Sequence, residues 1–199
     1  GRELCGKLFL SHISYPPAMH AADGALVLNR LAPLPPRRLE SHKGMFGEAL
    51  VIAGAAAYLG APALCALSFL RPGGGYVRLA TPRSIAPLLA VSAAEAVFVH
   101  LDETTEGTAA MSNLENLLER AALADVVVLG PGLSLHAETQ QLVRALVPVV
   151  KAPLLIDGDG LTAVAANPGL LRNRTHPTLL TPHVGEMARL IQWSVDDVI

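Results

Sequence analysis

The amino-acid sequence predicts an α/β fold in which a doubly wound, mainly parallel sheet is flanked by helices. Four short apolar runs, at 49–53, 126–129, 154–156 and 178–180, each end abruptly in a cluster of small or charged residues. Strand-like and helix-like segments alternate from the first of these runs onward. Buried parallel strands read as continuous apolar runs, and repeated βα units give parallel sheets with right-handed crossovers.

The individual elements follow from local patterns. Strands are expected at short apolar runs, namely at 7–13, 49–53, 76–80, 97–101, 125–129, 153–156 and 178–180. Helices are expected where apolar residues recur three or four positions apart, at 61–70, 111–123, 138–147, 161–166 and 185–192. In the second of these helices we expect Ser112 to be the N-cap and Glu115 to complete a capping box.

Composition bounds the class of protein. With 51% hydrophobic and 16% charged residues, the chain can bury a sizeable core, which excludes a disordered protein. A formal charge of −2 opposes binding to nucleic acid, because neutralising phosphates requires a basic face. No apolar run reaches the ~18–20 residues that span a bilayer, so we expect no membrane contact. Cys5 and Cys65 form no CxxC motif, which favours a reduced, cytoplasmic setting.

A domain boundary is expected near residue 40. The prolines of residues 31–38 favour an extended connector, so we divide the chain into residues 1–40 and 41–199. The first residue is Gly1 rather than Met, and residues 196–199 read as the opening of another helical stretch. We therefore expect a piece of a longer protein, incomplete at its C-terminal end.

Glycines and acidic residues follow the later strands, where α/β sheets bind ligands. Gly130 and Gly132 permit positive φ and leave backbone N–H groups open to an anion or a ribose, although a tight βα turn explains them equally well. Asp157 and Asp159 suit Mg²⁺, which prefers one or two carboxylates plus phosphate oxygens. The alternative for Asp159 is that it caps the next helix.

Two further motifs open helices. His183 and Glu186 begin the last expected helix, where Glu186 could serve only to stabilise the helix dipole. A histidine at this junction is harder to explain structurally and is a candidate functional residue.

Ala61 lies at the start of an earlier helix, where helix initiation is the leading interpretation and close approach of a ligand is the alternative. Residues 41–47 precede the first strand of the repeated pattern, so we expect them at the edge of the sheet opposite the ligand-binding carboxyl ends. There they would form a turn or a subunit contact. The GxGxxG, P-loop and GxSxG motifs are absent from the sequence.

Seven short motifs follow one another in order, at residues 41–47 (SHKGMFG), 50–54 (LVIAG), 60–62 (GAP), 71–77 (RPGGGYV), 128–133 (VLGPGL), 156–161 (IDGDGL) and 180–186 (LTPHVGE). Together they resemble the ADP/ATP-dependent NAD(P)H-hydrate dehydratases, a ribokinase-like family, over residues ~40–190. The resemblance implies repair of nicotinamide cofactors hydrated at C6, that is, conversion of (6S)-NAD(P)H hydrate to NAD(P)H. ADP or ATP phosphorylates the hydrate hydroxyl, and elimination of phosphate, a better leaving group than hydroxide, restores the double bond.

The resemblance also implies roles for single residues. Ala61, Gly132 and His183 would bind the hydrated nicotinamide. Asp157, Asp159 and Glu186 would lie near the nucleotide phosphates, with Glu186 and Asp157 as the residues for Mg²⁺.

Some parts of the family pattern find no counterpart in the sequence. The nucleotide loop, the anion hole and the catalytic aspartate would lie beyond Ile199, so no catalytic residue is assigned here and this piece alone is expected to be inactive.

Residues 1–40 resemble the tail of an NAD(P)H-hydrate epimerase domain with its linker, as in bifunctional repair enzymes. We expect a homo-oligomer. Two other functions remain open. One is a ribokinase-like kinase for a vitamin precursor or sugar, against which His183 and the His-Lys-Gly opening weigh. The other is a non-catalytic nucleotide-binding relative.

Overall fold

A computed structural model of the chain describes residues 36–37, 39–172 and 174–198. The chain divides into two units, Gly1–Ser41 and His42–Ile199, and the second contains all the elements described below. The strand expected at 7–13 lies outside the described residues. The strands of the second unit are β1 (Glu48–Ile52), β2 (Tyr76–Pro82), β3 (Val97–Leu101), β4 (Val126–Leu129), β5 (Leu154–Ile156) and β6 (Thr178–Leu180).

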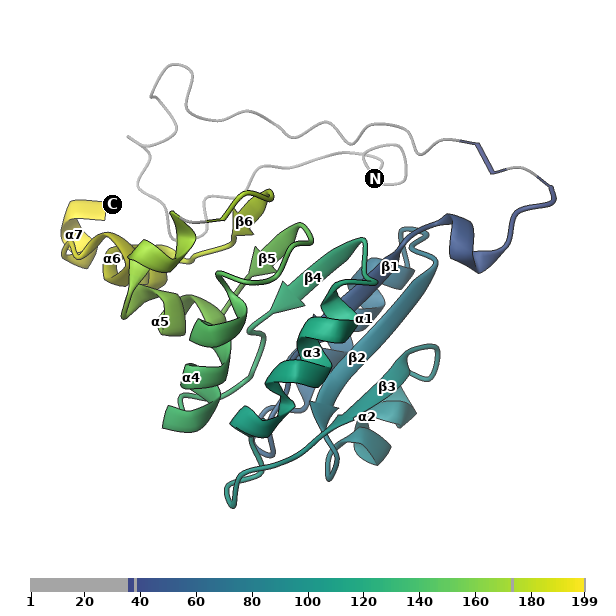
Figure 1. The fold of residues 1–199 in the computed structure, drawn as a ribbon, viewed down its shortest axis with the longest axis horizontal. Helices are drawn as coiled ribbons and strands as arrows, with labels where there is room; N and C mark the ends of the chain where they lie inside the picture. The colour runs from purple at the N-terminus through teal and green to yellow at the C-terminus, as the bar shows by residue number, and fades with distance from the viewer. Residues whose placement is uncertain (1–35, 38, 173, 199) are drawn as a thin grey trace, which may run out of the picture. The chain divides into compact units, whose positions relative to one another are not determined.

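These strands form one six-stranded sheet in the order β3-β2-β1-β4-β5-β6, and every neighbouring pair is parallel (Figure 1). The chain moves outward from β1 to β3 and then returns past β1 to start again at β4. Strand order therefore reverses between β1 and β4. In doubly wound sheets the ligand crevice opens at this reversal, beyond the carboxyl ends of the strands. The predicted α/β fold is confirmed.

Helices connect the strands and lie on both sides of the sheet. The α-helices are α1 (Gly60–Leu70), α2 (Ala86–Ser92), α3 (Leu114–Ala121), α4 (Ala137–Leu146), α5 (Asp159–Ala165), α6 (Val184–Ile191) and α7 (Val195–Val198). Three short 3₁₀ helices accompany them, η2 (Lys43–Met45), η3 (Met111–Asn113) and η4 (Pro168–Leu171). The sequence did not predict α2, because its short apolar stretch has no polar face from which a helical period could be recognised.

Two apolar cores, one on each face of the sheet, hold the layers together. Successive strand residues point to opposite faces, so in β1 Leu50 and Ile52 join one core while Ala49 and Val51 join the other. The first core is closed by residues of α3, α4 and α5, and the second by residues of α1 and α2. Figure 1 shows α3 in front of the sheet and α2 behind it. Because both faces are covered, β1 is apolar along almost its whole length.

One predicted helix start is wrong. The segment at 111–123 begins with the 3₁₀ turn η3, so the N-cap of α3 is Asn113 rather than Ser112. The Ser112 hydroxyl instead donates to the carboxylate of Asp102, at 3.3 Å. The buried Asn113 amide bonds the backbone of Asp102 in both directions, which fixes the preceding loop. The tertiary contact therefore overrides the local capping signal.

Candidate active site

The loops that follow β1 and β4 are joined where the strand order reverses. The Gly54 amide donates to the Pro131 carbonyl at 3.0 Å, so the two loops are braced against each other. Gly132 has φ of +64°, and a Cβ at this position would lie 2.8 Å from the Cβ of Tyr58 and 3.4 Å from that of Ala61. The structure thus brings Ala61 and Gly132 together at the carboxyl edge of the sheet, and Tyr58 lies beside them.

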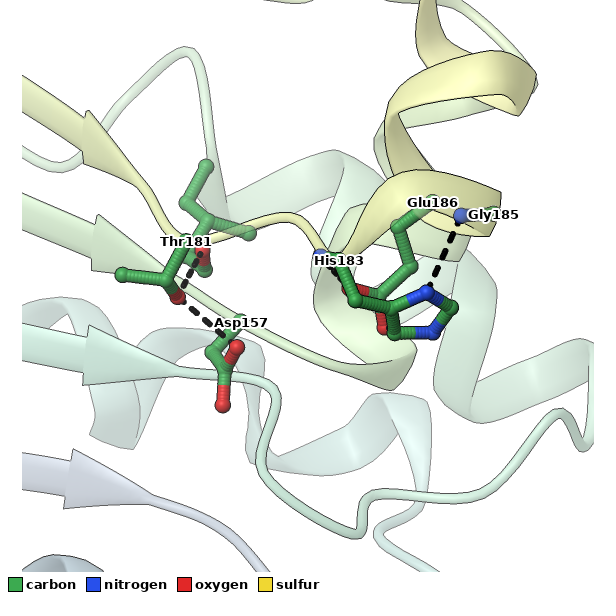
Figure 2. A network of polar contacts seen from close by, with 6 residues as sticks. Asp157, Thr181, His183, Gly185 and Glu186 are labelled. Atoms are coloured by element: carbon green, nitrogen blue, oxygen red, sulfur yellow. Dashed lines mark hydrogen bonds and ion pairs between the residues drawn. The ribbon is translucent and has the colours of Figure 1, made fainter. Parts of the chain in front are cut away.

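Asp157 follows β5 directly and is hydrogen-bonded to the loop after β6. Its Oδ1 accepts a hydrogen bond from the Thr181 hydroxyl at 2.7 Å (Figure 2). The end of β4 also lies close, because a Cβ on Gly130 would fall 2.0 Å from the Asp157 carbonyl oxygen. The glycine at 130 is therefore required for the two strand ends to approach each other, and φ there is +125°.

Cys65 lies one helical turn after Ala61 on α1. Burial and, as the smaller cause, the negative charge of Asp157 together raise the pKa of the Cys65 thiol to about 11. The charge of Asp157, at the end of β5, thus acts on the thiol of α1. The thiol is protonated at neutral pH and is not a nucleophile there.

Asp159 hydrogen-bonds the loop that follows β4. Its carboxylate accepts a hydrogen bond from the Ser134 amide at 2.8 Å, across to the loop after β4. The side-chain amide of Gln140 donates to the backbone carbonyls of Ser134 and Asp159. The N-cap of α5 is Gly158, and no side chain caps it. Asp159 therefore does not cap α5, and one of its carboxylate oxygens is engaged by the Ser134 amide.

His183 and Glu186 form a capping box at the start of α6. The Gly185 amide donates to Nδ1 of His183 at 3.1 Å, and the His183 amide donates to Oε2 of Glu186 at 2.9 Å (Figure 2). The Glu186 residue is 8% exposed, whereas the His183 side chain is 68% exposed. Because Nδ1 accepts a hydrogen bond, the neutral ring carries its N–H on Nε2.

The two carboxylates predicted for Mg²⁺ differ in what they can offer. Both oxygens of Glu186 are directed at His183, one at the backbone amide and one 3.4 Å from Nε2 of the ring. Asp157 keeps Oδ2 without a hydrogen bond to any described residue. Over residues 36–37, 39–172 and 174–198, no three His, Cys, Asp or Glu side chains gather as metal ligands. Asp157 therefore has one carboxylate oxygen that is free for a ligand, whereas both oxygens of Glu186 are engaged at the start of α6.

Three residues at this edge were not selected from the sequence: Tyr58, Cys65 and Thr181. Tyr58 lies in a loop without periodicity, and it reaches this edge through its closeness to Gly132, a residue far along the chain. Thr181 directly follows a strand with a hydroxyl side chain, which is the one signal that could have found it. Cys65 belongs to an apolar helix and carries no pattern of its own.

A cavity of about 530 Å³ lies at the opposite, amino edge of the sheet. Its charged groups are already paired: Arg78 with Glu48, whose backbone amide donates to Asp125 at 2.8 Å. Lys43 and Arg78 both lie over the Tyr76 ring, at 4.8 and 5.1 Å from its centre. Residues 42–47 lie at or near this edge, away from the carboxyl ends of the strands, as predicted. The paired charges of this edge favour a structural role. No helix in the described part of the chain is both long and apolar enough to cross a membrane.

Comparison with known proteins agrees with this geometry. A profile of the NAD(P)H-hydrate dehydratase family matches residues 49–198. A bifunctional NAD(P)H-hydrate repair enzyme from Thermofilum pendens is 52% identical, over 100% of this chain and 38% of the relative. Among solved structures, the ADP/ATP-dependent NAD(P)H-hydrate dehydratase of Bacillus subtilis, co-crystallised with ATP and Mg²⁺, is 29% identical with a TM-score of 0.62. A ribokinase-like superfamily protein from Enterococcus faecalis is 26% identical with a TM-score of 0.66.

These matches cover most of this chain but only part of each relative. The two solved structures are matched over 83% and 81% of this chain and over 54% of their own lengths. The chain thus spans about half of those structures and 38% of the Thermofilum pendens relative. The ribokinase-like fold expected from the motifs is confirmed. The family profile covers most of the chain, and the chain belongs to the NAD(P)H-hydrate dehydratase family.

Proposed function

We propose that this chain takes part in nicotinamide-cofactor repair, as the substrate-binding part of an enzyme that dehydrates (6S)-NAD(P)H hydrate with ADP or ATP. One observation carries the proposal: Ala61 and Gly132 meet where the strand order reverses, and neither has a bulky side chain. The ring of a hydrated dihydronicotinamide could lie against these small residues, and glycine is required at 132 because a Cβ there would lie 2.8 Å from the Cβ of Tyr58.

The remaining residues of this edge suit the chemistry of the reaction. The His183 ring is exposed and carries its N–H on Nε2, where a substrate oxygen could accept a hydrogen bond beside Glu186, while Nδ1 and the backbone amide hold the start of α6. Asp157 offers one carboxylate oxygen from the end of β5. Phosphorylation converts the hydrate hydroxyl at C6 into a phosphate ester, and departure of the phosphate together with a proton from C5 restores the C5=C6 double bond.

The co-substrate in this proposal is ADP or ATP, accompanied by Mg²⁺. The Bacillus subtilis dehydratase, which shares this fold, was co-crystallised with both ATP and Mg²⁺. When bound, the metal would neutralise the phosphate charge that develops during transfer. In this proposal Asp157 would hold the metal, since its Oδ2 makes no hydrogen bond to a described residue, and the carboxylate of Asp159 holds the neighbouring loop.

The organisation of the parent protein forms part of the same proposal. Residues 1–40 are the tail and linker of an epimerase domain, and residues 41–199 are the first part of the dehydratase domain. The Thermofilum pendens relative is named bifunctional, in line with this division. The setting is cytoplasmic, and the assembly is a homo-oligomer.

The test uses the complete parent protein and substitutes Ala61→Leu, which fills the floor of the site. Wild-type protein should convert hydrated NADH to NADH when ADP is added, seen as recovered absorbance of the dihydronicotinamide. Ala61→Leu should raise KM for the hydrate on the order of 10-fold or more, with KM for the nucleotide little changed. The matched control is Ala122→Leu, an exposed alanine at the C-terminal end of α3, which should leave both values unchanged.

Two results would contradict the proposal in different ways. If the wild-type parent protein shows no recovery of dihydronicotinamide absorbance with ADP or ATP, the proposed activity is wrong. If Ala61→Leu behaves like the control in an active protein, the substrate lies elsewhere.

A further inference from the structure

We propose that a hairpin at residues 103–109 positions the turn at residues 55–58 beside the substrate, and that the buried hydroxyls of Thr108 and Thr139 hold this hairpin in place. The inference rests on the proposed function, because it assigns the turn to one side of the substrate site. Thr108 and Thr139 do not touch the substrate in this proposal and are therefore positioning residues.

The hairpin follows β3 and is closed by its own backbone. Glu103 and Ala109 form an antiparallel bridge, and the Thr104 amide donates to the Thr108 carbonyl at 2.9 Å. Both carboxylate oxygens of Glu103 accept hydrogen bonds from Ser84, one from its amide at 2.6 Å and one from its hydroxyl at 2.7 Å. The base of the hairpin is thus fixed to the loop that follows β2.

The tip of the hairpin contacts the turn that carries Tyr58. The Ala56 amide donates to the Gly107 carbonyl at 2.9 Å. A Cβ on Gly107 would lie 2.7 Å from the Cβ of Ala56, so glycine is required for this close approach. The Tyr58 amide closes the turn by donating to the Ala55 carbonyl at 2.8 Å. A shift of the hairpin tip is therefore passed to Tyr58, which lies beside Gly132.

Two buried hydroxyls fix the hairpin to α4. Thr139 is 0% exposed and Thr108 is 3% exposed. The Thr139 hydroxyl lies 2.8 Å from the Thr108 hydroxyl and 2.8 Å from the Ala109 carbonyl oxygen. The Thr104 hydroxyl lies 2.8 Å from that of Thr108. Each hydroxyl can donate one hydrogen bond and accept two, so these groups satisfy one another. Because a buried hydroxyl that loses its partner costs free energy, the contact between Thr108 and Thr139 resists opening.

These contacts form a closed ring beside the point where the strand order reverses. Helix α4, which carries Thr139, directly follows the loop that contains Gly132. From Thr139 the ring passes through Thr108 to the tip of the hairpin. From the tip it passes through the 55–58 turn to Tyr58 and so returns to Gly132. The gap between Tyr58 and Gly132 cannot widen unless another contact of the ring breaks. Such a ring matters for function because small displacements of groups around a substrate cost activity.

The first experiment measures hydrogen–deuterium exchange of the Ala56 amide in the complete parent protein, by mass spectrometry with fragmentation to single residues. Thr108→Val keeps the shape of the side chain and removes its hydroxyl, so the Ala56 amide should exchange on the order of 10-fold faster. Thr108→Ser keeps the hydroxyl and should stay close to the wild-type rate. The matched control is Thr162→Val, because Thr162 is a half-buried threonine of α5, outside the hairpin and the turn. Circular dichroism shows whether each variant is folded.

The second experiment measures the kinetics of the same proteins with hydrated NADH and ADP. Thr108→Val should raise KM for the hydrate on the order of 10-fold and leave KM for ADP little changed, whereas Thr108→Ser and Thr162→Val should match the wild type. Gly107→Ala pushes the hairpin tip against Ala56 with every hydroxyl intact, and it should raise the same KM. Thr139→Val removes the other hydroxyl of the pair and should reproduce both effects of Thr108→Val.

The outcomes separate this inference from the proposed function. An unchanged exchange rate at Ala56 in folded Thr108→Val would overturn the role of the hydroxyls. Faster exchange with an unchanged KM for the hydrate would overturn the positioning of the substrate. If Thr108→Val does not fold, Thr139→Val and Gly107→Ala decide by the same two measurements. A wild-type parent protein without dehydratase activity would contradict the proposed function and, with it, the role at the substrate, whereas the exchange at Ala56 would still show whether the hydroxyls hold the turn.

Discussion

Gly130 and Gly60 differ in the room that each leaves for a side chain. Gly130 has φ of +125°, and a Cβ there would lie 2.0 Å from the Asp157 carbonyl oxygen. Gly60 begins α1, and a Cβ there would meet nothing within 4 Å. The first glycine is required by both backbone conformation and packing, whereas the second is required by neither.

We predict opposite effects of alanine at these two glycines. Gly130→Ala should lower the free energy of unfolding by about 3 kcal/mol or more, because the β4 and β5 ends must separate. Gly60→Ala should leave it unchanged or raise it by up to about 1 kcal/mol, since alanine favours a helix more than glycine does. Urea unfolding of both variants measures the difference, and equal stability of the two would contradict the role assigned to Gly130.

The thiol of Cys65 provides a prediction about pH. With its pKa raised to about 11, the thiolate fraction at pH 8 is small, so alkylation by iodoacetamide should be on the order of 100-fold slower than for an unperturbed cysteine. The rate should rise with pH until about pH 11. Asp157→Asn removes the smaller of the two causes and should lower the pKa, which speeds alkylation at pH 8. Asp159→Asn is the control and should not, because Asp159 does not contribute to this pKa. Peptide mass spectrometry at Cys65 gives the rates.

At the scale of elements, Arg174 ties the end of α4 to the starts of the last two strands. Its guanidinium donates to the carbonyls of Val147 at 2.6 Å, Val150 at 2.8 Å and Ala152 at 3.0 Å. It also donates to the Thr178 hydroxyl at 2.6 Å. These carbonyls lie after the last turn of α4, where helices leave backbone acceptors without partners.

We predict that Arg174→Lys lowers the free energy of unfolding by about 1–3 kcal/mol, because a single ammonium group cannot reach all four acceptors. The control is Arg172→Lys, which changes an exposed arginine two positions earlier and should stay within about 0.5 kcal/mol of wild type. Unfolding of both variants in urea measures the two free energies of unfolding. A loss of the same size in both would mean that the bonds of Arg174 add no stability.

Most elements could be predicted from the sequence, and the exceptions have physical causes. The six strands of the repeated pattern were expected within two residues of their ends, since buried parallel strands are short and apolar. Helix α2 escaped prediction because Ile85–Ala94 is apolar on both its buried and its exposed sides. The capping box expected at Ser112 failed, whereas one forms at His183, where only the glutamate was expected to have a structural role.

For the whole molecule, the polarity of the sheet made part of the site predictable. Gly132, Asp157 and His183 all follow strands of one parallel sheet, and the carboxyl ends of such strands share an edge. The contacts within that edge could not be predicted, because they join residues far apart in the chain. The approach of Tyr58 to Gly132 and the bond from Thr181 to Asp157 depend on strand order and loop conformation, which no local pattern encodes. The ligand roles of these residues stay predictions.

The hydrogen bond between Gly54 and Pro131 has a consequence for affinity. It is a bond between two backbone groups of the chain itself, so the two loops are held by the protein's own contacts. Binding then loses little backbone entropy on the protein side, and more of the contact energy appears as affinity. Loops held in this way favour tight binding of a ligand that is present at low concentration.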